Sequence, residues 1–200
     1  MTPDEEKQLT NRDRQREERR QQILDRSLDM IISRGYEATR IRDVADSLHI
    51  SIGLFFNYFE SKEAIYEELV KIGLSGPESA LAFNVEGVDP LELFEQMTTY
   101  VFEALKAYSF TAKMFLLMAQ ALRTDSVPEG VKRLIAGFDY ITPLVAVVQR
   151  GQALGEIKPG DPVALILAYW GAVQGIAENY AAHPELPLPE SRWIVDIVRK

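Results

Sequence analysis

The sequence predicts an all-α protein, and three observations predict it. Apolar residues recur at helical spacing along almost the whole chain, and the alternating patterns that are typical of strands are nearly absent. Several segments also begin with a helix N-cap that is followed by proline. With 46% apolar residues among 200, the chain can bury a substantial core. We therefore expect about nine helices and no sheet.

Four helices are predicted in the first part of the chain. The first ends before Gly35, a residue that favours the left-handed conformation beyond a helix C-terminus. Ser51 and Ser61 are good N-caps for the third and fourth helices. The run Ser75-Gly76-Pro77 then predicts a break. The predicted helices cover residues 14–34, 41–48, 51–59 and 62–74.

Five longer helices are predicted beyond this break. The clearest start is Asp89-Pro90-Leu91-Glu92, which supplies an N-cap, proline at the first position and glutamate at the third. Pro143 falls inside one pattern and should kink or break that helix near Ile141. The predicted helices cover residues 90–107, 110–123, 128–149, 162–182 and 189–199.

Composition excludes several classes of site and of location. There is no cysteine, so disulfides, thiolate nucleophiles and cysteine metal sites are absent. The N-terminus lacks an apolar signal segment, and the longest apolar run, residues 163–173, is too short to span a bilayer. We therefore expect a cytoplasmic protein without a membrane partner. The net charge of −8 does not decide whether the chain binds nucleic acid, because the distribution of charge matters more than the sum.

The stretch SLHISIGLFFNYFESK, residues 47–62, is typical of a helix-turn-helix. The second helix ends, three residues turn the chain, and a short third helix follows, which in this motif lies in the DNA major groove. His49 stands at a turn position that favours positive φ, which histidine tolerates better than most residues. Phe55 and Phe59 are four apart and share the face that should pack on the core. The aromatic side chain of Phe56 must then point elsewhere and needs a partner.

This stretch and its surroundings resemble the tetracycline-repressor (TetR) family of bacterial transcriptional regulators. The matching residues are Gly35-Tyr36, Thr39, residues 41–45, Ile50-Ser51, Gly53, residues 55–59 and Ser61-Lys62-Glu63. The resemblance implies a sequence-specific, ligand-responsive repressor that binds a palindromic double-stranded DNA operator as a homodimer. It also implies a charged, flexible arm over residues 1–13, a DNA-binding domain over 14–60, a connecting helix over 61–75, and a helical ligand-binding and dimerisation domain over 76–200.

The resemblance also implies which residues contact DNA. These are Arg42, Ser51, Ile52, Gly53, Leu54, Phe56, Asn57, Tyr58 and Lys62. Ile52 stands where many members carry a basic or polar residue, and Arg40 is a candidate to offset this loss with a phosphate contact of its own. Arg40 also occupies a frequent Ser/Thr cap position, so that either Thr39 caps the second helix or the cap is weak. Phe56 often has a tyrosine counterpart, so one hydroxyl is missing.

In such regulators the larger half usually houses an inducer cavity, here for an unknown small-molecule effector. The scarcity of basic residues there favours an apolar or cationic ligand. Residues that place polar groups or flexible side chains among apolar ones are the candidates for its lining: Tyr100, Met118, Gln120, Tyr140, Thr142, Trp170 and Gln174. Small residues at three- and four-residue spacing, together with the C-terminal segment, are the candidates for a dimer interface: Ala164, Ala168, Gly171, Ala172, Gly175, Trp193, Ile194 and Ile197.

Two rival functions belong to other classes. An enzyme lacks support, since the only histidines are His49 and His183 and no glycine-rich phosphate loop or nucleophile motif is present. We therefore expect no catalytic residue, no metal and no cofactor. A helical adaptor that has lost DNA binding is compatible with Ile52 and with the acidic net charge. Binding to DNA without sequence preference would instead indicate a nucleoid-type role.

Overall fold

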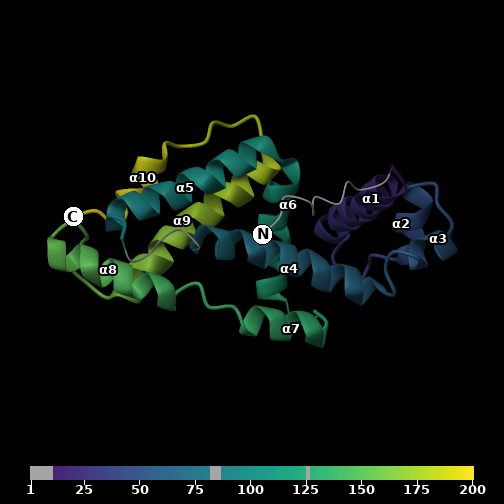
Figure 1. The fold of residues 1–200 in the computed structure, drawn as a ribbon, viewed down its shortest axis with the longest axis horizontal. Coiled ribbons are helices and arrows are strands. Elements are labelled where there is room, and N and C mark those ends of the chain that lie inside the picture. The colour runs from purple at the N-terminus through teal and green to yellow at the C-terminus, as the bar shows by residue number, and fades with distance from the viewer. Residues whose placement is uncertain (1–10, 82–86, 125–126) are drawn as a thin grey trace, which may run out of the picture. The chain divides into compact units, whose positions relative to one another are not determined.

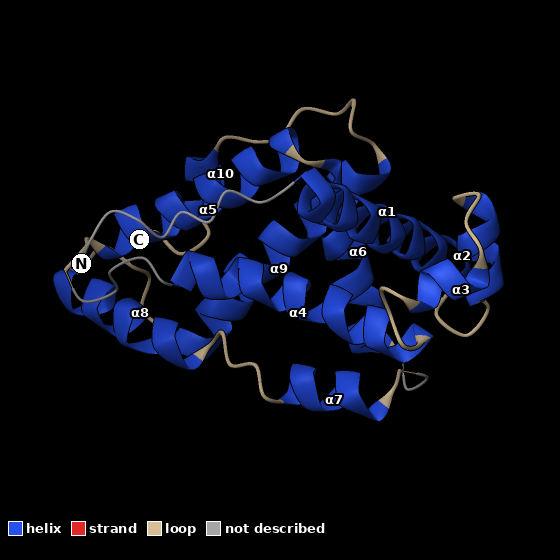
Figure 2. Cartoon of the chain, turned by 45° about the vertical axis from the view of Figure 1, so that its right-hand side comes forward, coloured by secondary structure: helices blue, strands red, loops and turns tan. Residues whose placement is uncertain are grey.

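The computed structural model describes residues 11–81, 87–124 and 127–200. These residues form ten α-helices and no strand, with one isolated antiparallel bridge between Ile157 and Arg199 (Figures 1 and 2). The all-α prediction is therefore confirmed. The chain divides into two compact units, one ending at Tyr66 and the other beginning at Glu67.

The first unit contains three helices and the start of a fourth. They are α1 (Asn11–Arg34), α2 (Ile41–Ser47), α3 (Ile52–Phe56) and α4 (Lys62–Leu81), of which only the first turn of α4 belongs to this unit. α2 packs on α1, and α3 packs on α2. The shared core consists of side chains that are at most 4% exposed: Ile23, Leu24, Leu28, Ile31, Val44, Ala45, Phe55 and Phe59.

The turns of the first unit follow the sequence predictions. Gly35 has a φ of 84° after α1, and His49 has a φ of 54° in the turn between α2 and α3. The Ser51 hydroxyl accepts a hydrogen bond of 3.0 Å from the Leu54 amide and so caps α3. The N-cap of α2 is Arg40, without a side-chain hydrogen bond. Of the two alternatives for this helix start, the weak cap is the one observed.

Helix lengths in this unit differ from the predictions in three places. α1 begins at Asn11, so that residues 11–13 of the predicted flexible arm are helical, while residues 1–10 lie outside the described residues. α3 ends at Phe56, since the backbone turns at Asn57 and Tyr58. The predicted break at Ser75-Gly76-Pro77 is wrong, because α4 continues through it to Leu81. An internal proline removes one hydrogen bond of the helix without necessarily ending it.

The second unit contains the remainder of α4 and six further helices. They are α5 (Pro90–Ala107), α6 (Ser109–Arg123), α7 (Glu129–Ala136), α8 (Thr142–Leu154), α9 (Pro162–Ala182) and α10 (Ser191–Val195). α9 packs against α5, α6, α8 and α10, and α10 also packs along α5 (Figures 1 and 2). At the centre of this core the rings of Phe94 and Tyr169 meet edge-to-face at 4.7 Å.

Two predicted helices of the second unit are corrected. The helix expected over 128–149 is interrupted before Ile141, as Pro143 predicted, and becomes α7 and α8. The Asp139 carboxylate accepts hydrogen bonds from the Thr142 side chain and from the amides of Thr142 and Ile141, which holds its pKa below the ordinary value and supports the start of α8. α8 extends to Leu154, beyond the expected end at residue 149.

The final helix, expected over 189–199, is α10 and has only five residues. Beyond it the backbone pairs with the segment after α8. The Lys158 amide donates to the Val198 carbonyl at 2.9 Å, and the Lys200 amide donates to the Glu156 carbonyl at 2.8 Å. Residues 198–200 therefore pair with residues 156–158 and do not continue α10.

None of the helices formed by the described residues combines the length and the apolar character that crossing a membrane requires.

Candidate functional site

The short helix α3 presents an exposed apolar surface. Phe55 is fully buried, whereas its neighbour Phe56 is 47% exposed. Ile52 and Leu54 are 38% and 37% exposed, and Asn57 at the end of the helix is also exposed. The five residues of α3 therefore carry three large apolar side chains that are exposed to solvent.

Contacts on its buried side hold α3 in place. The rings of Phe55 and Phe59 pack at a centroid distance of 6.3 Å, and the guanidinium of Arg20 lies 5.0 Å from the centre of the Phe59 ring. A Cβ on Gly53 would meet only the Ser51 hydroxyl, at 3.9 Å. Packing within the chain therefore does not require glycine here, and the backbone of α3 is open to a close approach from outside.

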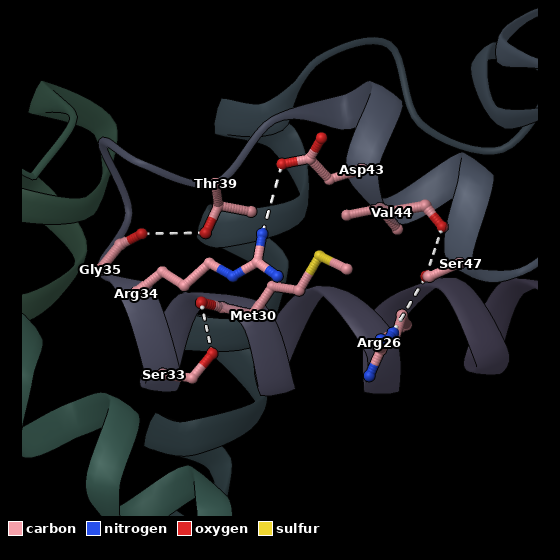
Figure 3. Close-up of polar contacts among 9 residues, drawn as sticks. All are labelled: Arg26, Met30, Ser33, Arg34, Gly35, Thr39, Asp43, Val44 and Ser47. Atoms are coloured by element: carbon pink, nitrogen blue, oxygen red, sulfur yellow. Dashed lines mark hydrogen bonds and ion pairs between the residues drawn. The ribbon is translucent and has the colours of Figure 1, made fainter.

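Polar contacts fix α2 against α1 (Figure 3). The Arg26 side chain donates to the Ser47 hydroxyl at 2.9 Å, and Ser47 donates to the Val44 carbonyl at 2.7 Å. At the other end of α2, Arg34 forms an exposed ion pair of 3.4 Å with Asp43. Both ends of α2 are thereby attached to α1.

Two arginines at the start of α2 stand apart from these contacts. Arg40 and Arg42 are exposed, and within the described part of the chain neither forms an ion pair. Their positive charge is therefore available to an external anion. The Thr39 hydroxyl is buried and donates to the Gly35 carbonyl at 2.9 Å, so it closes the preceding turn and does not cap α2.

The start of α4 holds a cluster that the sequence analysis missed. The Lys62 ammonium donates to the Tyr36 carbonyl at 2.9 Å and lies 4.0 Å from the centre of the Tyr36 ring. Tyr36 donates its hydroxyl to Glu63 at 2.8 Å and stacks on Tyr66 at 4.8 Å. Lys62, which the sequence analysis assigned to DNA, is thus already engaged within the chain. No local signal in the sequence could have revealed this contact, because Tyr36 and Lys62 are 26 positions apart.

These contacts shift the pKa values of the cluster. Burial raises the pKa of the Tyr36 phenol, and the hydrogen bond to Glu63 raises it further. The same hydrogen bond is the main cause that lowers the pKa of Glu63. Burial also raises the pKa of Tyr66 to about 12. The cluster is therefore a neutral tyrosine bonded to an ionised glutamate throughout the neutral pH range.

The seven candidate pocket residues do not all come together. Tyr140 meets Trp170 edge-to-face at 6.1 Å, and Gln174, one turn further along α9, donates to the Phe115 carbonyl at 3.3 Å. The buried indole N–H of Trp170 has no hydrogen-bond partner among the described residues. Leaving a buried donor without an acceptor costs free energy.

The other four candidates are placed differently. Tyr100 is 45% exposed, and Gln120 and Thr142 are also exposed, so the structure does not bring these three side chains into an enclosed cavity. These three positions lie on helix faces that turn away from the core, which periodicity did not resolve. Met118 is half-buried and packs beside Gly73 of α4, where a Cβ would come within 2.7 Å of its sulfur.

One face of α9 is exposed and carries the small residues of the candidate dimer interface. Ala164, Ala168 and Gly171 are exposed, and a Cβ on Gly171 or Gly175 would meet nothing within 4 Å. An apolar groove of about 340 Å³ runs beside this face, between α9 and the segment 186–189, and includes Ala172. Packing within the chain therefore does not explain the two glycines.

The C-terminal candidates for the interface differ from one another. Trp193 is 56% exposed and Ile197 is half-buried. Ile194 is only 6% exposed and belongs to the core of the second unit, so its assignment to the interface is corrected. Trp193 and Ile194 are adjacent on α10 and therefore point in directions about 100° apart, so that one is exposed and the other is buried.

Comparison with known proteins gives concordant results. The family model described as bacterial regulatory proteins, tetR family, matches residues 23–69, which cover α2, α3 and the flanking parts of α1 and α4. The HTH-type transcriptional repressor KstR2 of Rhodococcus jostii (strain RHA1) is 30% identical in an alignment 174 positions long that covers 78% of each chain.

Solved structures resemble this fold over most of its length. The TetR family transcriptional regulator PfmR from Thermus thermophilus has a TM-score of 0.70 and 23% identity, covering 87% of this chain and 93% of that one. AibR, solved in complex with isovaleryl coenzyme A and operator DNA, has a TM-score of 0.66 and 18% identity, covering 89% and 94%. At these identities the likeness concerns the fold.

Proposed function

We propose that this chain, which belongs to the tetR family of bacterial regulatory proteins, is a transcriptional repressor that binds an operator through α3 and releases it when a small molecule binds. The observation that carries the proposal is the exposed apolar surface of α3. Phe56, Ile52 and Leu54 face solvent on a helix whose opposite side is anchored by the buried Phe55. Thymine methyl groups in the major groove are suitable partners for such side chains.

The contacts divide into those that recognise bases and those that position the protein. Leu54 and Phe56 meet thymine methyls, and the exposed amide of Asn57 bonds to a base edge or a phosphate. Arg40 and Arg42, which have no ion-pair partner among the described residues, bind phosphates. The remaining proposed contacts come from the same turn and its flanks: Ser51, Ile52, Gly53, Tyr58 and Lys62.

Lys62 has a second role in this proposal. Its ammonium is hydrogen-bonded to the Tyr36 carbonyl, so its charge is held at a fixed position beside the start of α4. An ammonium has three N–H bonds, and those not used by Tyr36 remain for a phosphate. Lys62 thus positions the loop after α1 as well as the DNA backbone.

The repressor acts as a homodimer in this proposal. The exposed face of α9, with Gly171 and Gly175 in open space, allows close approach of a second helix, and Trp193 adds a large exposed apolar side chain. A two-fold axis would present two copies of α3 to successive major grooves and require a palindromic operator.

The effector site proposed here lies at Trp170. Its unpaired indole N–H calls for a hydrogen-bond acceptor, and Tyr140 supplies an aromatic wall. The neighbouring amide of Gln174 is already bonded to Phe115 and Glu178. A ligand with an apolar body and one acceptor oxygen fits this set. Isovaleryl coenzyme A is the ligand in the AibR structure.

Helix α4 is the proposed link between effector and DNA, because it begins in the first unit and continues into the second. In the second unit Met118 packs against Gly73 of α4 without room for a Cβ. A ligand that favours another position of α4 would change the separation of the two copies of α3. Release requires a preference for the non-binding state of at least about 1–3 kcal/mol.

Selection of bound sequences from randomised duplexes tests the proposal, at near-physiological salt and with folded, dimeric protein. A palindrome with half-sites about one helical turn apart would support it. Recovery of no preferred sequence despite DNA binding would favour a nucleoid-type role. Absence of binding altogether would favour the adaptor alternative.

A further inference from the structure

The N-terminal half of α1 and the helix α3 enclose a cleft of about 840 Å³ within the first unit. The wall formed by α3 and the turn after it contains three residues of the proposed DNA surface. The wall from α1 is rich in arginine. The first wall contributes Leu54, Asn57 and Tyr58, and the second contributes Arg12, Arg16 and Arg19.

The three arginines share one face of α1. At about 100° per residue, positions 12, 16 and 19 fall within roughly 60° of one another. The acidic residues that also border the cleft are Asp13 and Glu18, which lie roughly 90° and 130° from the middle of this arc, on opposite sides, and so form its rims. The centre of this wall is therefore positive, although the chain as a whole is acidic.

These arginines are not neutralised by the described part of the chain. No hydrogen bond or ion pair there involves Arg12, Arg16 or Arg19. Other arginines of the same helix are engaged, since Arg14 donates to the Asn11 side chain at 3.0 Å and Arg34 pairs with Asp43. The free arginines are thus those that face the cleft.

The N-terminal turns of α1 gain little from packing. All residues from 11 to 18 are exposed, and the first buried side chain of α1 is Ile23. Helices in water depend mainly on a packed face, so this projecting segment contributes little to the stability of the core. It places a row of cations opposite α3.

We propose that this cleft is a second DNA-contact site, in which Arg12, Arg16 and Arg19 bind phosphates of the strand that borders the groove entered by α3. The proposal rests on the proposed function of α3. The three positions span about 10.5 Å of the helix axis, which corresponds to about three base-pair steps at 3.4 Å each. Guanidinium groups bind phosphate with strong, bidentate hydrogen bonds. Asn57 and Tyr58 contact the same strand from the other wall.

The test measures affinity against salt concentration, from about 50 to 200 mM, for the full-length chain. The probes are a fixed duplex of arbitrary sequence, about 30 bp long, and the duplex selected by the wild-type protein. The variant combines Arg12→Gln, Arg16→Gln and Arg19→Gln, and glutamine keeps a good helix propensity. The matched control removes the same charge from exposed positions of the second unit by Lys106→Gln, Arg123→Gln and Arg133→Gln. Circular dichroism verifies that both variants are folded.

The slope of log affinity against log salt should become shallower by about 0.9 for each phosphate that is no longer neutralised, and so by up to about 2.7 per subunit. A change of about 2.7 corresponds to about 40-fold over this fourfold salt range. The control should keep the wild-type slope. An unchanged slope on both probes would overturn the proposal and leave α3 binding intact. A reduced slope without any preference for the selected duplex would instead count against sequence-specific recognition.

An opposite change gives a second, independent test on the same probes. Glu18→Gln removes a negative charge from the rim of the cleft and should strengthen binding at about 50 mM salt. The control Glu103→Gln, at an exposed position of α5, should not change it. Equal affinities of these two variants would contradict a phosphate path through the cleft.

Discussion

Phe55→Ala and Phe56→Ala alter adjacent residues of α3 that face opposite environments. Phe55 is 0% exposed and contacts the rings of Phe56 and Phe59 at 5.7 and 6.3 Å. Its truncation leaves a cavity and should destabilise the first unit by about 3–5 kcal/mol. Phe56 is 47% exposed, so its burial contributes roughly half of the 1.5–3 kcal/mol that a fully buried side chain of this kind contributes. Truncation of Phe56 should therefore lower the stability of the fold by about 1 kcal/mol. Its main loss should be in DNA binding, by about 1–3 kcal/mol if it contacts a thymine methyl.

Thermal unfolding, followed by circular dichroism, and titration of a selected duplex separate these effects. The Phe55→Ala variant should melt at least about 6 °C below the wild-type protein, taking about 2 °C for each kcal/mol. The Phe56→Ala variant should melt within a few degrees of wild type and bind the duplex about 5- to 150-fold more weakly. The reasoning is refuted if Phe56→Ala lowers the melting temperature as much as Phe55→Ala, or if it leaves the affinity unchanged.

Three further predictions concern other parts of the chain. The lowered pKa of Glu63 contributes stability that is present above about pH 4.3 and is lost as the pH falls. Because Tyr36→Phe removes the hydrogen bond that lowers this pKa, the free energy of unfolding of the variant in urea should depend less on pH than that of wild type between about pH 5 and 3. Identical pH profiles would contradict this. Gly171→Arg should weaken the dimer without lowering the stability of the monomer, as measured by analytical ultracentrifugation, since a Cβ there meets open space; an unchanged dimerisation constant would exclude this face. Thr98→Val removes the hydroxyl that lies 2.9 Å from the buried Tyr169 hydroxyl and should cost about 1–2 kcal/mol in urea unfolding; no change would indicate that the Phe94 carbonyl alone satisfies Tyr169.

Local sequence signals predicted most of the first unit. Gly35 and His49 occupy positive φ, as expected from the turn chemistry, and Ser51 caps α3. The division of α3 into a buried Phe55 and an exposed Phe56 followed from helical spacing alone. These features depend on residues that are near one another in the sequence, and short-range rules describe such residues well.

Features that depend on distant residues were not predictable. The engagement of Lys62 by Tyr36 joins positions 26 apart, and no local pattern encodes it. Ile194 is buried in the core of the second unit among residues that are distant in the sequence. Pro77 is tolerated within α4, because a proline disfavours but does not forbid a continuing helix. Periodicity marks a face as apolar, but it does not tell which neighbour covers that face.

Competition between two duplexes tests the central claim most directly. The duplex recovered by selection and a scrambled duplex of the same composition are titrated against the wild-type dimer at about 150 mM salt. Sequence-specific recognition through α3 predicts a preference of at least about 10³ for the selected duplex. Equal affinities for the two duplexes would contradict the account, because phosphate contacts alone would then explain all binding.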